Sequence, residues 1–260
     1  MRNQTRVLLW FATVLLTMAL CCTAIAQGAS VSGRVFRDVN GNKLEEEQER
    51  SIYGVKITLI QVSQAAETAL ETITTGRDGK YAFNGLQAGA YRLDIQLPAR
   101  TYFIEPAKGG SAALPAQGSR GRTPVFALKD GEVVEMPVGT TKRPSYFNFV
   151  AFEDLNRNGS RYSTEPLLQG VEVSILYDWQ GETYVIAKTL TNQNGFAQFR
   201  FLTPATYRME ALLPIPYSIG PRGAKDNVFF NVFTPSGENA GTAGPYALES
   251  MLGLGISGVR

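Results

Sequence analysis

The chain of 260 residues has no histidine, and its two cysteines, Cys21 and Cys22, both lie in an N-terminal segment with the pattern of an export signal. Without histidine there is no imidazole general base, no Ser-His-Asp triad and no imidazole metal ligand. Without cysteine after residue 26, the exported chain has neither disulfides nor a thiol nucleophile. Carboxylate pairs remain as a route to catalysis, but no convincing pair stands outside the two loops described below. We therefore expect that the protein is not an enzyme.

An excess of charge of one sign is also missing. Lysine and arginine total 25 against 23 aspartates and glutamates, which gives a net charge of +2. No long run of one sign provides the basic surface that nucleic-acid binding needs, so we expect no nucleic-acid partner. Apolar residues make up 44% of the chain, enough to predict a packed core rather than disorder.

Residues 1–26 have the three parts of a signal peptide: two arginines, an apolar run over 7–22, and the small-residue site Ala24-Ile25-Ala26. A retained membrane anchor is the alternative, but the run is short for a hydrocarbon core of about 30 Å. Lipid attachment at Cys21 is disfavoured by the bulky Leu20 before it. We expect Sec-dependent export from a bacterial cell, no membrane span after cleavage, and a secreted, extracellular or cell-envelope location.

The chain repeats itself at a spacing of 116 residues without a gap, from 36–98 onto 152–214. The identical pairs include Asp38/Asp154, Asn40/Asn156, Asn42/Asn158, Glu49/Glu165, Gly54/Gly170, Gly79/Gly195, Tyr91/Tyr207 and Arg92/Arg208. A period this long indicates two whole domains rather than short solenoid units. The predicted organisation is a signal peptide over 1–26, domains over 27–143 and 146–260, and a short linker over 144–145.

Each repeat alternates apolar and polar residues with a period of two, as at Val55, Ile57 and Leu59. Turn-forming pairs such as Asn194-Gly195 separate the alternating runs. Short strands with frequent turns, and no amphipathic helix after the signal, predict an all-β protein of two tandem antiparallel, immunoglobulin-like β-sandwiches.

An acidic loop follows the first expected strand of the second repeat. Its oxygen-bearing residues stand at positions 1, 3, 5, 7 and 12, with Gly159 at position 6 for the sharp turn, which is the spacing of an EF-hand calcium loop. Position 7 offers its main-chain carbonyl and position 12 both carboxylate oxygens. The predicted ligands are Asp154, Asn156, Asn158, Ser160 and Glu165.

The first repeat carries the same loop with one departure. Its predicted ligands are Asp38, Asn40, Asn42, Leu44 through its carbonyl, and Glu49, and Glu46 adds a carboxylate at position 9. Lys43 replaces the glycine at position 6, where a non-glycine residue with positive φ costs roughly 1 kcal/mol. Its charge also opposes a metal ion, so the first loop is the weaker candidate.

A plain turn is the alternative for such a segment, because Asp, Asn and Gly are favoured in turns. Two loops in register, each with glutamate at position 12, count against it. With few carboxylates in each loop, we expect weak calcium binding, with a dissociation constant on the order of 10⁻⁴ to 10⁻³ M.

Several motifs together resemble the B domains of bacterial serine–aspartate-repeat surface adhesins. They are Ser32–Asn42, Gly54–Leu59 and Thr75–Leu86, and the resemblance extends over both repeats. It implies a prealbumin-like sandwich that binds calcium through the two ligand sets and serves as a stiff spacer for other domains. The second repeat departs from the pattern at Gln193-Asn194-Gly195-Phe196, which leaves further ligands there in doubt.

The resulting expectation is a secreted or cell-surface structural and interaction protein, a monomeric rod that acts as a spacer or adhesion module. Its partner is an extracellular protein or glycan of unknown identity. If the first domain has its ends at opposite poles, loop 38–49 lies near the second domain, where calcium would restrict the inter-domain angle. The alternative is a carbohydrate- or partner-binding accessory module using Trp179, Tyr184 and Tyr217, although cross-strand packing or a place at a hairpin tip is the favoured explanation of these aromatics.

Overall fold

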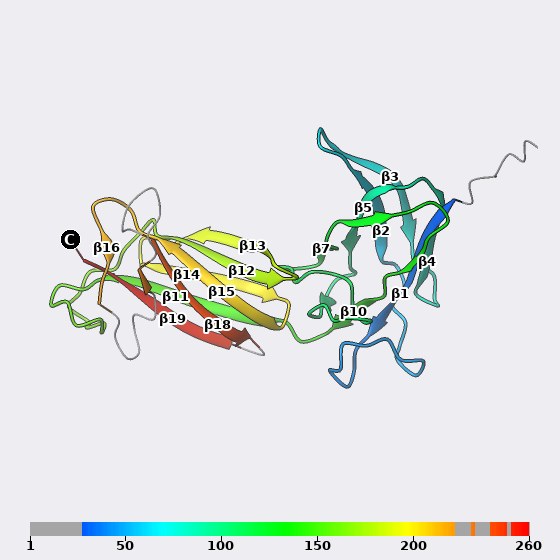
Figure 1. Cartoon of the computed structure of the whole chain (residues 1–260). Helices are drawn as coiled ribbons and strands as arrows, with labels where there is room; N and C mark the ends of the chain where they lie inside the picture. The colour runs from blue at the N-terminus through cyan, green and yellow to red at the C-terminus, as the bar shows by residue number, and fades with distance from the viewer. Residues whose placement is uncertain (1–27, 222–229, 232–239, 249–250, 260) are drawn as a thin grey trace, which may run out of the picture.

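The computed structural model describes residues 28–221, 230–231, 240–248 and 251–259, and every regular element in them is a β-strand. The strands form two sandwiches that lie end to end, with β1 (Ala29–Arg37) in one and β19 (Met251–Val259) in the other (Figure 1). The predicted signal peptide lies outside the described residues. Within them, no helix has the length and apolar character needed to cross a membrane.

The first sandwich packs a sheet of order β4-β1-β10-β6, with β9 also paired to β1, against a sheet of order β3-β2-β5-β7, with β8 also paired to β5. Its remaining strands are β2 (Lys56–Val62), β3 (Glu67–Thr74), β4 (Lys80–Leu86), β5 (Gly89–Gln96), β6 (Tyr102–Phe103), β7 (Arg120–Arg122), β8 (Phe126–Leu128), β9 (Val133–Glu135) and β10 (Val138–Thr141).

The second sandwich pairs a sheet of order β14-β11-β19-β16 with one of order β13-β12-β15-β18-β17. Its remaining strands are β11 (Ser145–Glu153), β12 (Glu172–Trp179), β13 (Glu182–Leu190), β14 (Phe196–Leu202), β15 (Ala205–Leu212), β16 (Ser218–Ile219), β17 (Phe230–Asn231) and β18 (Ala240–Leu248). Strand β11 begins at Ser145, inside the segment 144–145 that the sequence assigned to the linker.

The duplication is visible strand by strand. Strands β11, β14, β15 and β16 begin and end 116 residues after β1, β4, β5 and β6. The two repeats therefore fold alike over more of their length than the identical residues alone indicated.

The all-β sandwich prediction is confirmed, with one difference in strand direction. Most neighbouring strands are antiparallel, but β1 pairs in parallel with β9 and β10, and β11 pairs in parallel with β19. In each repeat the first and the last strand therefore lie side by side in one sheet and run in the same direction. Alternation along single strands does not show which strands meet, so the sequence could not reveal this pairing.

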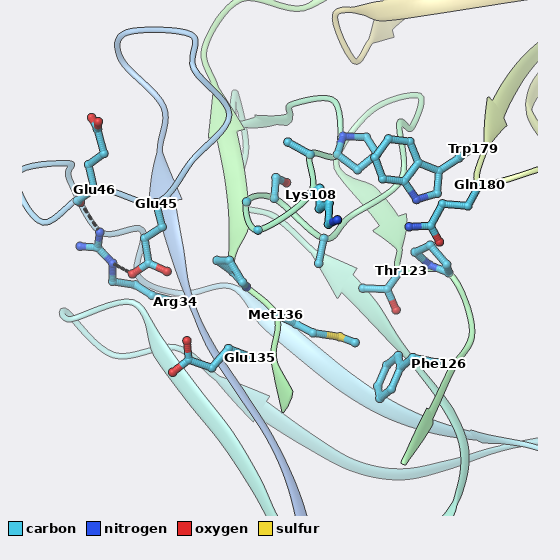
Figure 2. Close-up of a pocket in the computed structure, with 18 of the residues that line it drawn as sticks. Arg34, Glu45, Glu46, Lys108, Thr123, Phe126, Glu135, Met136, Trp179 and Gln180 are labelled. Atoms are coloured by element: carbon cyan, nitrogen blue, oxygen red, sulfur yellow. Dashed lines mark hydrogen bonds and ion pairs between the residues drawn. The ribbon is translucent and has the colours of Figure 1, made fainter. Parts of the chain in front are cut away.

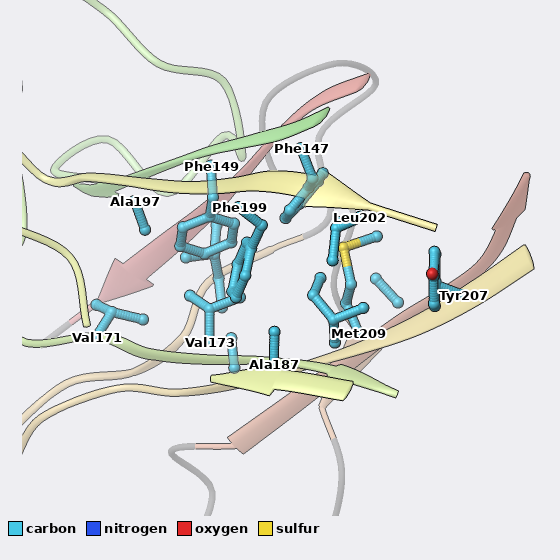
Figure 3. Close-up of a cluster of buried hydrophobic side chains, with 14 of the residues drawn as sticks. Phe147, Phe149, Val171, Val173, Ala187, Ala197, Phe199, Leu202, Tyr207 and Met209 are labelled. Atoms are coloured by element: carbon cyan, nitrogen blue, oxygen red, sulfur yellow. The ribbon is translucent and has the colours of Figure 1, made fainter. Parts of the chain in front are cut away.

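Each sandwich encloses its own core of alternating side chains. Along β5 and β15, buried residues recur at every second position, as the period-two pattern predicts. In the second sandwich Phe147, Phe149 and Phe199 pack over Val173 and Met209 between the two sheets (Figure 3).

A buried tyrosine fixes the same corner of both cores. Tyr91 and Tyr207 are almost fully buried, and each hydroxyl donates a hydrogen bond to a carbonyl four residues earlier, that of Gln87 at 2.9 Å and of Thr203 at 2.7 Å. Burial raises the pKa of Tyr207 well above its usual value, so its hydroxyl keeps the proton that the bond needs. This bond ties the strand to the turn that precedes it, as a tyrosine corner does in other sandwiches.

Replacing either tyrosine by phenylalanine is expected to lower the free energy of unfolding by about 1 kcal/mol, because one buried hydrogen bond is lost while the ring stays. Chemical denaturation of Tyr91→Phe and Tyr207→Phe measures this. Tyr53→Phe is the control, since Tyr53 is exposed, and it should leave stability unchanged. Equal stability of all three variants and the unmodified chain would contradict the assignment.

Candidate metal centres

The two acidic loops leave the ends of equivalent strands and are closed at their base. Residues 38–49 follow β1, and residues 154–165 follow β11. An isolated bridge joins Phe36 to Ser51 at the base of the first loop, and another joins Phe152 to Leu167 at the base of the second. The two ends of each loop are therefore held together by the sheet, and the loop between them has the same length in both repeats.

In the second loop, main-chain N–H groups orient the side chains at positions 1 and 12. Asp154 accepts from Asn158 N–H at 3.1 Å and from Gly159 N–H at 2.6 Å. Glu165 accepts from Leu155 N–H at 3.1 Å and from Tyr162 N–H at 2.9 Å. Both carboxylates consequently turn in toward their own loop.

The amides of the same loop are oriented in the same way. Asn156 accepts from Asn158 N–H at 3.1 Å, and Asn158 accepts from Ser160 N–H at 2.8 Å. All four side-chain ligands predicted from the spacing are thus brought together as oxygen acceptors inside one turn of chain.

The first loop repeats this network. Asp38 accepts from Gly41 N–H at 2.6 Å and from Lys43 N–H at 3.0 Å, while Glu49 accepts from the N–H groups of positions 2 and 9 at 3.1 and 3.3 Å. Asn40 and Asn42 each accept from the N–H two residues further on, at 3.0 and 2.9 Å. Replacement of glycine at position 6 has therefore not changed the folding of the loop.

Both loops need positive φ at two positions, not one. Position 4 is Gly41 (φ 80°) in the first loop and Arg157 (φ 55°) in the second, and position 6 is Lys43 (φ 66°) and Gly159 (φ 72°). Each loop has glycine at one of these positions and a charged residue at the other, so each carries one strained residue. The sequence predicted the strain at Lys43 but missed it at Arg157, although Gly41 was a signal for position 4.

Burial separates the carboxylates from solvent without supplying a counter-charge. Asp154 is 2% exposed, Glu165 is 6% exposed and Glu49 is 7% exposed. Among the described residues, no lysine or arginine forms an ion pair with these three side chains or with Asp38. Buried carboxylates are normally paired with a cation or bound to a metal, because desolvation of an isolated charge is costly.

Each loop contains few carboxylates among its candidate ligands. The described residues contain no group of three or more histidine, cysteine, aspartate or glutamate side chains arranged to hold a metal ion. The Glu46 carboxylate at position 9 instead accepts from the side-chain amides of Asn40 and Asn42, at 2.7 and 3.0 Å. Each loop therefore offers two carboxylates, two amide oxygens and main-chain carbonyls, a set suited to a hard cation such as Ca²⁺.

A neighbouring segment of the first sandwich supports the first loop. Ser111 N–H donates to the Lys43 carbonyl at 3.0 Å, and Gly110 passes so close to that carbonyl that a Cβ would collide with it. The Lys43 ammonium forms an ion pair with Glu105 at 2.5 Å, which directs its charge away from the loop interior. No local sequence pattern predicted this ion pair, because Glu105 lies 62 residues after Lys43 in the chain.

The two sandwiches contact each other through main-chain hydrogen bonds. Gly118 N–H donates to the Phe201 carbonyl at 2.7 Å, and Thr203 N–H donates to the Ala116 carbonyl at 2.9 Å. The Phe201 ring stacks on Tyr102 with centroids 5.8 Å apart and tilts against Tyr146 at 5.7 Å. This junction is a packed contact rather than a free hinge.

A groove of about 880 Å³ opens beside the junction (Figure 2). Phe126 and Met136 of the first sandwich line one part of it. Trp179, the last residue of β12, and Gln180, in the turn that follows, line another part. An ion pair at 2.6 Å between Arg34 of β1 and Glu45 of the first loop also lines the groove.

The three aromatics considered as a sugar platform do not form one. Trp179, Tyr184 and Tyr217 are partly buried and all pack against the core of the second sandwich. Trp179 stacks on Tyr177 at 6.2 Å, whereas Tyr217 donates to Glu153 at the far end of β11. Their places favour packing roles.

A model of the SdrD B-like domain matches residues 29–136 and 148–231. The chain belongs to the SdrD B-like domain family. The match covers most of both sandwiches, and each matched segment contains one complete acidic loop. An extracellular or cell-envelope location, expected from the N-terminal export signal, agrees with membership of this family.

Two relatives show the extent of the similarity. Serine-aspartate repeat-containing protein D of Staphylococcus aureus strain Newman is 29% identical over 185 residues, which cover 71% of this chain and 13% of that protein. Serine-aspartate repeat-containing protein F of Staphylococcus epidermidis is 29% identical over 189 residues, 73% of this chain and 10% of that protein. The chain therefore spans only a small part of the length of these relatives.

Among solved structures, GBS52, the minor pilin of Streptococcus agalactiae, aligns over 90% of this chain and 96% of its own with a TM-score of 0.36 and 10% identity.

Gly110→Ala is expected to destabilise the first sandwich by about 1–3 kcal/mol, because the added methyl group forces the Lys43 main chain out of place. Denaturant unfolding measures the loss. The control is Gly76→Ala, where the nearest atom lies 3.4 Å away at the end of the Asp78 side chain, so no comparable loss should appear. If Gly110→Ala is as stable as this control, segment 105–111 does not support the loop.

Proposed function

We propose that the chain is a non-enzymatic, exported spacer or adhesion module in which each of the two B-like sandwiches binds one calcium ion. The ions would be held by Asp38, Asn40, Asn42, Glu49 and the Leu44 carbonyl in the first sandwich, and by Asp154, Asn156, Asn158, Glu165 and the Ser160 carbonyl in the second. The domains are proposed to extend over residues 27–143 and 146–260.

The observation that carries this proposal is the burial of Asp154 and Glu165 without a basic partner among the described residues. Their oxygens are already turned inward by main-chain donors, so little reorganisation remains to be done when a cation binds. A divalent cation supplies the counter-charge that the fold does not provide.

Binding would act mainly on stiffness. Position 1 directly follows β1 or β11, and position 12 lies just before the bridge that closes the loop. A cation shared by these two positions cross-links the ends of the loop and disfavours its opening. At the junction, the hydrogen bonds of Ala116 and Gly118 with the second sandwich hold the two units in register, which suits a spacer that transmits orientation.

Two other functions have less support. Among the described residues, no arrangement of side chains favours catalysis, and Trp179, Tyr184 and Tyr217 do not share the aromatic face that stacking on sugars needs. The partner of the spacer, an extracellular protein or glycan, is proposed only as a class.

Calcium is expected to raise the melting temperature of the exported chain. At saturating calcium and a dissociation constant on the order of 10⁻⁴ to 10⁻³ M, each site contributes on the order of 1–3 kcal/mol. Thermal unfolding with calcium and with a chelator measures the difference. The variant pairs Asp38→Ala/Glu49→Ala and Asp154→Ala/Glu165→Ala should each lose the part of the shift that belongs to their own loop.

Asp178→Ala is the matched control. It removes an exposed carboxylate that pairs with Arg208 outside both loops, so its calcium-dependent shift should equal that of the unmodified chain. Absence of any calcium-dependent shift in the unmodified chain would refute the proposal.

A further inference from the structure

Lys43 belongs to the first calcium loop and to a contact outside it. Its main-chain N–H donates to Asp38 at position 1, and its side chain reaches Glu105 at 2.5 Å. The positive φ of Lys43 favours glycine, yet a glycine has no side chain to form the ion pair with Glu105. Among the described residues, Lys43 is the only residue of the loop that forms an ion pair with Glu105.

Glu105 continues the contact into the second sandwich. Its other carboxylate oxygen lies 3.5 Å from the main-chain nitrogen of Thr206 in β15. The pKa of Tyr177 in β12 is raised, first by burial and then by the charge of Glu105, which is consistent with Glu105 lying near the Tyr177 hydroxyl as well. The Glu105 side chain itself is 18% exposed.

We propose that Lys43 and Glu105 are positioning residues that couple calcium binding in loop 38–49 to the orientation of the second sandwich. This rests on the proposed function, because it assumes that the loop binds calcium. A cation at Asp38 fixes the main chain of position 6, the fixed main chain holds the Lys43 side chain, and the Lys43 ammonium holds Glu105 next to Thr206.

The arrangement of the junction gives this contact its effect. Phe201 is at the end of β14, in one sheet of the second sandwich, and its carbonyl bonds to Gly118 without involving the loop. Thr206 and Tyr177 lie in the opposite sheet. The hydrogen bonds and ring contacts around Phe201 and Thr203 are gathered at the end of β14, and a further contact on the other sheet restricts rotation of the second sandwich about that end.

The second repeat lacks both members of the pair. Gly159 stands at position 6 of its loop, and the residue 116 positions after Glu105 is Pro221. The coupling is thus specific to loop 38–49, and calcium at Asp154 and Glu165 should not affect the junction.

The test uses spin labels, because the exported chain has no cysteine of its own. Leu70→Cys in β3 and Val185→Cys in β13 are exposed positions, one in each sandwich. Pulsed electron–electron double resonance gives the distribution of distances between the labels, with saturating calcium and with a chelator. Calorimetry on the same proteins measures calcium binding separately.

In the otherwise unmodified chain, calcium is expected to narrow the distribution. Lys43→Gly and Glu105→Gln should lose the narrowing while loop 38–49 still binds calcium, and Lys43→Arg, which keeps charge and reach, should retain it. Asp154→Ala/Glu165→Ala should lose one bound ion without losing the narrowing.

The coupling would be overturned if calcium narrowed the distance distribution of Lys43→Gly and Glu105→Gln as much as that of the unmodified chain. It would also be overturned by calcium binding without narrowing in the unmodified chain, and in both cases the proposed calcium sites would stand. Failure of the unmodified chain to bind calcium would instead overturn the proposed function, and the coupling with it.

Discussion

The structure depends on the carboxylates at positions 1 and 12 of its two acidic loops, which no basic side chain among the described residues neutralises. In both repeats the carboxylates at positions 1 and 12 accept main-chain hydrogen bonds from their own loop and face inward. Hydrogen bonds from neutral N–H groups orient a carboxylate, but they do not replace a counter-ion when the group is as buried as Asp154 or Glu165. The proposed calcium ions would supply this missing counter-charge and would stiffen each loop by joining its two ends.

The second constraint is the junction. If the link between the two sandwiches were flexible, their relative orientation would not be fixed, however stiff each sandwich is by itself. Here main-chain bonds at Ala116 and Gly118, the Phe201 ring between Tyr102 and Tyr146, and the Glu105 contacts join the two units. The first loop lies near this junction, where the sequence placed it on the condition that the first domain has its ends at opposite poles, and Lys43 links the loop to Glu105.

The sequence predicted the features that repeat or alternate locally: the duplication, the period-two strands and the spacing of the acidic loops. It did not reveal features that depend on where distant strands meet. The parallel pairing of β1 with β10 and the ion pair of Lys43 with Glu105 both join residues more than sixty positions apart. The positive φ at Arg157 was missed for a different reason, because arginine gives no sign of a conformation that glycine usually takes. The predicted ligand positions all lie in the loops as expected, and their binding of calcium stays a prediction.

The central claim is that the chain holds two calcium ions, one in each loop. Isothermal titration calorimetry of the exported chain tests it most directly, because it counts the ions without relying on a change in stability. The account predicts two calcium ions per chain, with one lost when Asp154 and Glu165 are replaced by alanine. A titration that shows no binding heat, together with no calcium retained after equilibrium dialysis, would contradict it.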